Sequence, residues 1–317
     1  MVNLNSKRVP DFAAQKNDVA IRSGALFTAH PSSANSTLSL APVQLDIVAC
    51  NLPICAFNCA PMPDTVSAGE ILDHLIKVVR AVPLADKPFD HLQLNAVFPP
   101  SCYGQVIANL PETRYYGELN HSDARLPNGR SARRKLELRP AHLRKLPEPQ
   151  RKIWSAIASA FNAPELEAIY KERFAAALEG RFQKPTRDLK LHPAAMLLRD
   201  LGGYKISIHC DTFRKAITTQ YYLPRDASQL HLGTTFHEKK QDGAFVEVET
   251  LEFAPNSGYG FPVVSDSWHS VRQMKNEDGA RDSLMLIYYL DQGWLGEGVN
   301  RAKRFVQDVR CALAPAS

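Results

Sequence analysis

The sequence lacks a long apolar run and is poor in cysteine. No stretch of about 18 apolar residues occurs in its 317 residues, so we expect no membrane-spanning helix. Residues 1–24 have no apolar core of the kind that a secretory signal needs. The six cysteines are too few and too scattered for a disulfide scaffold. We therefore expect a protein of the reducing cytoplasm.

Several common catalytic signatures are also missing. The chain has no P-loop, no GxGxxG turn and no GxSxG elbow, which argues against those nucleotide-binding and hydrolase classes. Its net charge of +5 is too small by itself to indicate a nucleic-acid partner. Cys50, Cys55 and Cys59 match no paired zinc pattern, so we interpret them as free thiols.

Positive charge is concentrated between residues 125 and 152. This stretch holds ten Lys or Arg residues against two Glu. A solvated loop or lid would explain it without any function, whereas a docking surface would take an anionic substrate or partner through Arg133 and Arg134. Few aromatic residues are interleaved with these charges, so we do not expect the stretch to bind nucleic acid by base stacking.

The order of the expected elements places helices first and strands after them. Residues 1–42 are mixed polar, which predicts a loosely ordered lead-in to a single domain over 43–317. Short apolar strands separated by turn residues fill the region from about 188 to 292. Many short strands with regular turns indicate a sandwich or barrel, so we predict an α+β protein with a jelly-roll core.

Helical periodicity occupies much of residues 64–185, which also contain the basic stretch. Ser67 is a candidate N-cap for the first helix, and Pro164 fits the first turn of a later one. A further helix is expected over 297–313. The strand core should therefore be flanked by N-terminal helices and one C-terminal helix, and the helical half offers a surface for a homodimer.

The segment GYKISIHCDTF carries the main chemical signal. Because side chains alternate along a strand, His209 and Asp211 share one face while Cys210 points to the other. A third ligand can come from His269, which follows Asp211 by 58 residues, enough for intervening strands to return to the same end of a barrel. Two imidazoles and a carboxylate form the facial triad of non-haem iron oxygenases, but they also describe a catalytic zinc site or a structural polar patch.

Arg281 adds a second signal. It begins RDSLMLIYYL, the most apolar strand expected in the chain, 12 residues after His269. An always-charged guanidinium at the start of a core strand needs an anionic partner, because an unpaired buried charge is costly. A dicarboxylate bound at the metal would supply that partner, and Ser283 lies on the same face. A salt bridge to Asp282 or another nearby acid is the alternative.

Together these residues resemble the Fe(II)/2-oxoglutarate-dependent dioxygenases, whose pattern is HxD…H followed by Arg-x-Ser. The match covers residues 190–292 well, and the segment LLRDLGGYKISIHCDTFRKAITTQYYLPRD resembles the metal-binding strand and its partner strand in the bacterial small-molecule and prolyl-hydroxylase-like branches. The resemblance implies a double-stranded β-helix (jelly roll) with Fe(II), 2-oxoglutarate and O2 as cofactors. It also implies roles for the matched residues: His209, Asp211 and His269 as catalytic iron ligands, and Arg281 with Ser283 on the C5 carboxylate of 2-oxoglutarate.

The resemblance also indicates the reaction and further pocket residues. Hydroxylation of an unactivated C–H, with succinate and CO2 as coproducts, is the expected activity, and radical desaturation or cyclisation is the alternative within the family. The substrate is expected to be an amino acid or natural-product intermediate, acidic or bound to a carrier protein. A zinc hydrolase and a vestigial jelly-roll binding protein are the rival classes. The remaining cosubstrate candidates are Tyr204, Thr218 and Gln220, and the remaining substrate candidate is Tyr222.

Overall fold

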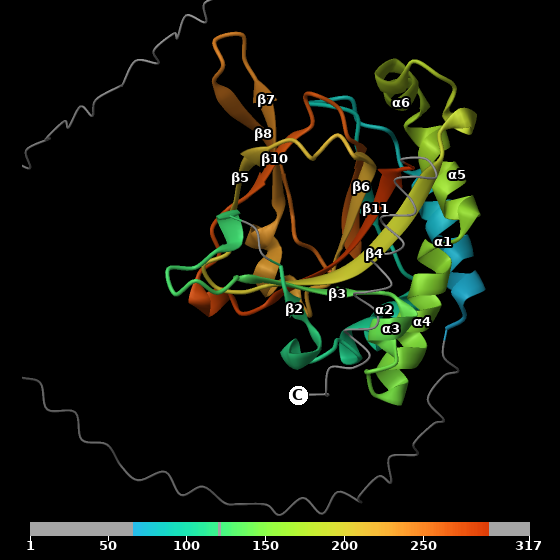
Figure 1. Ribbon diagram of the computed structural model, residues 1–317, viewed down its shortest axis with the longest axis vertical. Coiled ribbons are helices and arrows are strands. Elements are labelled where there is room, and N and C mark those ends of the chain that lie inside the picture. Colours follow the sequence, from blue (N-terminus) through green and yellow to red (C-terminus); the bar gives the residue numbers. More distant parts are fainter. Residues whose placement is uncertain (1–65, 120–121, 292–317) are drawn as a thin grey trace, which may run out of the picture. The chain divides into compact units, whose positions relative to one another are not determined.

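The computed structural model describes residues 66–119 and 122–291. Two antiparallel β-sheets face each other, and helices cover the outer face of the larger sheet (Figure 1). Within the described ranges, no helix combines the length and apolar character needed to cross a bilayer. The predicted lead-in 1–42, the predicted helix 297–313 and the cluster Cys50, Cys55 and Cys59 lie outside the described residues.

The larger sheet has seven strands in the order β1-β9-β6-β11-β4-β3-β2. β11 and β4 pair over their full ten residues, from Arg281 opposite Asp200 to Leu290 opposite Leu191, and they form the centre of the sheet. The strands are β1 (Leu92–Asn95), β2 (Gly117–Glu118), β3 (Arg133–Glu137), β4 (Leu191–Asp200), β6 (Lys215–Tyr222), β9 (Ser257–Pro262) and β11 (Arg281–Leu290).

The smaller sheet has four strands in the order β5-β10-β7-β8. They are β5 (Ile206–His209), β7 (Thr234–Lys239), β8 (Phe245–Leu251) and β10 (Trp268–Val271). Phe236 of this sheet packs against Tyr259 and Phe261 of the larger one, with ring centroids 5.6 and 6.1 Å apart. The predicted jelly-roll core is therefore confirmed, and β1, β2 and β3 add strands to its larger sheet from outside residues 188–292.

The described residues contain six α-helices before the core strands: α1 (Ala68–Ala81), α2 (Pro100–Ala108), α3 (Pro140–Leu143), α4 (Glu148–Phe161), α5 (Pro164–Arg173) and α6 (Ala175–Phe182). Ser67 caps α1 as predicted, because its hydroxyl accepts the Glu70 amide while the Glu70 carboxylate accepts the Ser67 amide. Pro164 occupies the first turn of α5, also as predicted.

The main hydrophobic core lies between the helices and the outer face of the larger sheet. Ile71 and Leu75 of α1 and Trp154 of α4 are buried there together with Tyr221 of β6 and Leu286 of β11. Since side chains alternate along each strand, the next residues of β6 and β11 point to the opposite face, between the two sheets. The helical layer thus leaves the inner face of the larger sheet for polar and ligand-binding side chains.

The basic stretch 125–152 differs from the expected loop or lid. Residues 133–137 form β3, which pairs with β4 from Arg133 opposite Asp200 to Glu137 opposite Met196. The stretch then enters α3 and the first turns of α4. The sequence does not predict this strand, because charged residues occupy both of its faces and the apolar alternation of a strand is absent. Each arginine pairs with an acidic residue: Arg133 with Asp200 and Arg134 with Glu118.

Gly258 in β9 should be sensitive to substitution. A Cβ at this position would lie 2.5 Å from the Gln220 carbonyl oxygen and 3.0 Å from the Tyr221 Cα, so Gly258→Ala must push β9 away from β6. We expect a loss of about 1–3 kcal/mol in the free energy of unfolding, measured by urea denaturation. Gly104→Ala in α2 is the control, because no atom lies within 4 Å of its added methyl group. Equal stability of the two variants would contradict the close approach of β6 and β9.

Candidate metal centre and cavity

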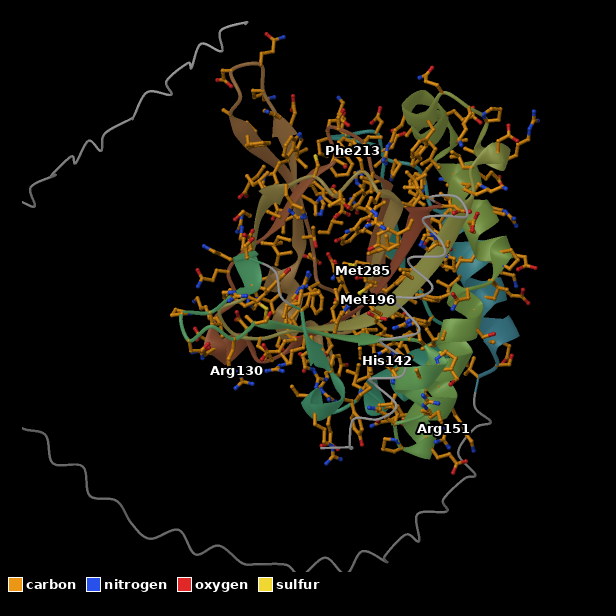
Figure 2. The ribbon with its side chains drawn as sticks, viewed as in Figure 1. Arg130, His142, Arg151, Met196, Phe213 and Met285 are labelled. Carbon is orange, nitrogen blue, oxygen red and sulfur yellow. The ribbon has the colours of Figure 1, made fainter. Side chains whose placement is uncertain are left out.

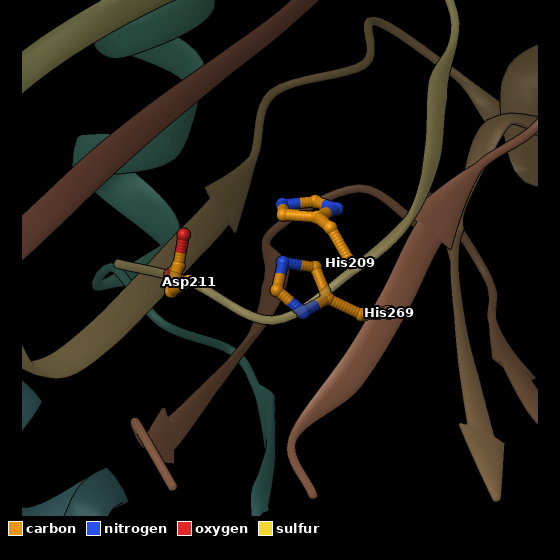
Figure 3. Close-up of side chains that lie close together, drawn as sticks. All are labelled: His209, Asp211 and His269. Carbon is orange, nitrogen blue, oxygen red and sulfur yellow. The ribbon is translucent and has the colours of Figure 1, made fainter. Parts of the chain in front are cut away.

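Three side chains with metal-binding atoms meet between the two sheets. His209 ends β5, Asp211 follows two residues later, and His269 lies in β10. One ligand atom from each lies within 4.8 Å of the others (Figure 3). The two imidazole centroids are 4.3 Å apart. The structure therefore brings together the three residues that the sequence proposed as ligands.

The local sequence explains why these side chains converge. β10 and β5 are antiparallel, and His269 stands directly opposite His209 in their register. Opposed residues on antiparallel strands project to the same face, and Asp211 returns to that face because it lies two positions after His209. After β6, the chain forms β7 and β8 in the smaller sheet and returns to the larger sheet as β9. It then enters the smaller sheet again as β10, which pairs with β5.

Both histidines are oriented by a backbone carbonyl two residues earlier. His209 Nδ1 lies 2.9 Å from the Ser207 oxygen, and His269 Nδ1 lies 2.9 Å from the Ser267 oxygen. A carbonyl oxygen only accepts hydrogen bonds, so in each neutral ring Nδ1 donates and Nε2 keeps its lone pair. Burial lowers the pKa of His269 to about 4, partly opposed by the nearby Asp211 carboxylate. His269 is therefore a neutral nitrogen donor at neutral pH.

The carboxylate of Asp211 is held from both sides. Lys215 Nζ donates to Oδ1 at 2.5 Å, and the Thr218 hydroxyl donates to Oδ2 at 2.6 Å. Burial alone would raise the pKa of Asp211, but the Lys215 ammonium, His269 and these hydrogen bonds lower it to about 2. The group is thus an anion with a fixed orientation, as a metal ligand must be.

The three residues open into a cavity of about 590 Å³. Its floor is the inner face of the larger sheet, where Met196 and Met285 stand opposite each other on β4 and β11 and lie between the sheets (Figure 2). Leu198 and Ile287 extend this apolar floor. The solvent-exposed Ile208 also lines the cavity.

A hydrogen-bonded network lies on the same cavity wall. The Tyr259 hydroxyl donates to Gln220 Oε1 at 2.7 Å, and Gln220 Nε2 donates to the Ser283 hydroxyl at 2.7 Å. Gln220 and Tyr259 line the cavity, as Thr218 does. Tyr222 does not line it, and its hydroxyl donates to Thr234 Oγ1 at 3.0 Å. Of the candidates on β6, the structure therefore places two in the cavity and the third behind it.

Arg281 has an anionic partner within the protein. Its side chain is 0% exposed, Nη1 donates to Asp200 Oδ2 at 2.8 Å, and Nε donates to the Leu232 carbonyl oxygen at 2.7 Å. Asp200 also accepts two hydrogen bonds from Arg133. Arg281 is not among the residues that line the cavity, whereas Arg133 is. The anion that the sequence required for Arg281 is thus supplied by Asp200, in agreement with the nearby-acid alternative.

The structure separates the two substrate candidates of the basic stretch. Arg133 and Lys135 lie two residues apart on β3 and both line the cavity. Arg134 points to the opposite face, where its Nη2 lies 3.4 Å from Glu118 Oε1, and it does not line the cavity. A charge count along the sequence could not distinguish them, because only the strand assignment shows which residues share a face.

Sequence reasoning missed three residues that the site uses. Lys215 could have been noticed as a cation four residues after Asp211, and Asp200 as a charge at the end of an apolar strand. Tyr259 gave no signal, because its place beside Gln220 depends on the β6–β9 register. His231 and His237 lie outside the triad. His231 hydrogen-bonds with the Asp278 carboxylate, and His237 hydrogen-bonds with the Ser270 hydroxyl.

The depressed pKa of His269 predicts how the metal-free protein responds to acid. Above pH 6.5 His269 is neutral in both the folded and the unfolded state and has no effect on their balance. Below pH 6.5 His269 is protonated in the unfolded state, whereas in the folded state it is protonated only below about pH 4. The free energy of unfolding therefore falls as the pH falls from 6.5 to about 4. The loss from this group should reach about 2 kcal/mol at pH 5.

Urea denaturation at pH 7.5 and pH 5, with a chelator present, measures this effect. His269→Gln should remove about 2 kcal/mol of the pH dependence. Gly104→Ala, which changes no titratable group and has no atom within 4 Å of its added methyl group, is the control and should keep the wild-type pH dependence. An unchanged pH dependence in His269→Gln would contradict the burial of a neutral imidazole.

No protein-family model matches the sequence, and no curated protein matches it. Among solved structures, the chain is similar to a prolyl-4-hydroxylase from Pseudomonas putida, with a TM-score of 0.41, 14% identity, and coverage of 69% of this chain and 98% of that chain. A 2OG-Fe(II) oxygenase family oxidoreductase from Burkholderia pseudomallei gives a TM-score of 0.39, 13% identity, and coverage of 71% and 91%. The non-haem α-ketoglutarate-dependent epimerase SnoN of nogalamycin biosynthesis gives a TM-score of 0.40 at 14% identity. The match covers 68% of this chain and 81% of SnoN.

Proposed function

We propose that the protein is an Fe(II)/2-oxoglutarate-dependent oxygenase that acts on a small molecule. The observation that carries this proposal is the convergence of His209, Asp211 and His269 within 4.8 Å at the wall of a cavity. Two neutral imidazoles and one carboxylate on one side of a metal leave the other positions for ligands, which is the facial triad of non-haem Fe(II) oxygenases.

The donor set fits such a metal. Each histidine has Nδ1 committed to a serine carbonyl, so Nε2 is the available nitrogen, and Asp211 is ionised and oriented by Lys215 and Thr218. Fe(II) with bound 2-oxoglutarate would activate O2, so that 2-oxoglutarate, O2 and a substrate C–H would give succinate, CO2 and the hydroxylated substrate. The chain's own task is then to fix the three ligands, exclude water and select the C–H that lies nearest.

A zinc hydrolase would use the same three ligands but would also need a general base. No glutamate is among the cavity-lining residues in the described part of the chain. The lining carboxylates are Asp211, which belongs to the triad, and Asp123, whose oxygens accept from the Ser207 amide and the Ser122 hydroxyl. This arrangement favours the oxygenase over the hydrolase.

The cavity also supports a dicarboxylate cosubstrate. Gln220 and Tyr259 offer polar atoms beside the triad, and the arginines Arg133 and Arg281 gather around Asp200 on the same sheet. We propose that the distal carboxylate of 2-oxoglutarate is taken up at this cationic end, where the sequence motif places Arg281 and Ser283.

The apolar floor favours a substrate with an aliphatic or aromatic body. Met196, Met285 and Ile287 provide contact without fixed hydrogen-bond demands, which suits positioning of an unactivated C–H. The ammonium group of Lys135, which lines the cavity, would bind an acidic group of a free or carrier-bound substrate. Hydroxylation is the proposed outcome, with desaturation or cyclisation as alternatives.

The test is an anaerobic titration of the full-length protein with Fe(II) and then 2-oxoglutarate. We expect the weak visible charge-transfer absorption of a 2-oxo acid chelated to Fe(II), and its loss when a chelator removes the metal. Asp211→Ala should abolish the band because one of three ligands is missing. His237→Gln is the matched control, since His237 lies in the neighbouring strand β7 but outside the triad.

Two outcomes would contradict the proposal. Bound iron without a band would exclude chelation of 2-oxoglutarate and favour the zinc-hydrolase or vestigial-site interpretations. A band of equal intensity in Asp211→Ala would show that the metal lies elsewhere.

A further inference from the structure

One arginine of the helical layer binds both segments of the chain that lead to metal ligands. Arg181 lies in the last turn of α6 and is not among the residues that line the cavity. Its Nη2 donates to the Phe213 carbonyl oxygen at 2.6 Å, and its Nη1 donates to the Lys215 carbonyl oxygen at 2.8 Å. Nη1 also donates to the Val263 carbonyl oxygen. A single guanidinium group therefore holds three carbonyl groups from two connections between strands.

These two connections position the carboxylate and one imidazole of the triad. Residues 210–214 lead from β5 to β6 and contain Asp211. Residues 263–267 lead from β9 to β10, in which His269 is the second residue. Arg181 binds the first connection where it enters β6 and the second where it leaves β9.

Arg181 binds at the point where the pairing of β6 with β9 ends. The last bond of that pairing runs from the Val263 amide to the Ala216 carbonyl oxygen at 2.8 Å. Lys215 precedes Ala216, and its carbonyl group is the next one beyond this bond. The two chains then diverge towards different ligands, so Arg181 continues the link between β6 and β9 by one further step.

Local hydrogen bonds carry the position of Val263 to the histidine. The Ser267 hydroxyl donates to the Val264 carbonyl oxygen at 2.9 Å, which closes a tight turn directly after Val263. The Ser267 carbonyl oxygen accepts from His269 Nδ1 at 2.9 Å. A shift of Val263 would therefore move this turn, and with it the imidazole.

The surroundings of Arg181 indicate that holding the main chain is its task. Burial alone lowers its pKa, so no acidic side chain in the described part of the chain opposes that effect. Its guanidinium carbon lies 4.4 Å from the Phe182 ring centroid and 5.0 Å from that of Phe213, which lies at the same end of the molecule as α6 (Figure 2). The half-buried charge is thus stabilised by carbonyl dipoles and aromatic rings instead of a salt bridge.

We propose that Arg181 is a positioning residue of the metal centre, which fixes Asp211 relative to His269 by binding both connections where β6 and β9 diverge. The helical layer thereby takes part in metal binding, although none of its side chains belongs to the triad. The inference rests on the proposed function, because it requires that the triad binds a divalent metal. It adds a residue outside both the HxD…H motif and the cavity wall.

The test measures the dissociation constant of Mn(II) for the full-length protein by electron paramagnetic resonance, so neither cosubstrate nor substrate is needed. Arg181→Met removes all guanidinium donors and keeps an unbranched side chain against Phe182. We expect Mn(II) to bind about ten- to thirtyfold more weakly, because groups that orient metal ligands contribute this much to affinity. Arg181→Lys keeps the charge but loses the planar fork, and its affinity should lie between those of wild type and Arg181→Met.

Arg173 of α5 provides the matched control. Its Nη1 and Nη2 donate to the carbonyl oxygens of Arg80 and Val82 at 3.3 and 2.6 Å, at the end of α1. Arg173→Met therefore also removes an arginine that binds main-chain carbonyl groups, but these groups belong to the helical layer. We expect this variant to unfold at a lower temperature and to keep the wild-type affinity for Mn(II).

The visible absorption of the Co(II)-loaded protein supplies a second readout, because its d–d bands report the geometry of the ligands. Arg181→Met should change the position or intensity of these bands relative to wild type. Arg173→Met should keep the wild-type spectrum, since a general loss of stability does not alter the geometry of the folded site.

The outcomes separate the inference from the proposed function. If wild type does not bind Mn(II), both fail. If wild type binds Mn(II) and the two Arg181 variants bind it equally well, only the inference fails. Equal weakening in Arg173→Met and Arg181→Met would assign the effect to overall stability and also overturn it. Should Arg181→Met not fold, Arg181→Lys decides: weaker binding than wild type supports the inference, and equal binding overturns it.

Discussion

The charge of Arg281 is the constraint on which the inner face of the larger sheet depends. A guanidinium stays ionised in a protein interior, so its burial requires an anion close by. Asp200 supplies that anion and is itself 0% exposed, which makes it dependent on Arg281 and Arg133 in turn. Removing Asp200 would leave two buried guanidinium groups without their anion, at a cost of about 3–5 kcal/mol. The ion pairs of Asp200 with Arg133 and Arg281 thus stabilise the register in which β3 and β11 pair with β4.

That register determines what else faces the cavity. With Arg133, Asp200 and Arg281 fixed in one row, the next inward positions place Lys135 and Leu198 side by side, and the row after that places Met196 opposite Met285. One end of the cavity is therefore cationic and its floor is apolar. The opposite wall presents the histidines of the smaller sheet, so the charged end and the metal-binding end belong to different sheets.

Both histidines of the candidate metal centre make the same local hydrogen bond. In Ser207-Ile208-His209 and in Ser267-Trp268-His269, the serine carbonyl two residues before the histidine accepts from Nδ1. Each strand therefore fixes its own imidazole without help from a distant residue. Asp211 is different, because Lys215 and Thr218 hold it from the beginning of β6. Packing of the two sheets only has to bring these preformed parts together.

The sequence by itself determined the parts of this protein that depend on alternation and spacing. Alternation put His209 and Asp211 on one face, a strand count made His269 their partner, and a buried cation at Arg281 demanded an anion. These inferences hold because they follow from backbone geometry and the cost of isolated charge. The tertiary structure alone decided which anion satisfies Arg281, which face of β3 carries Arg133, and where Tyr259 lies. Those depend on registers between strands far apart in the chain, such as β4 with β11 and β6 with β9, which no local pattern specifies.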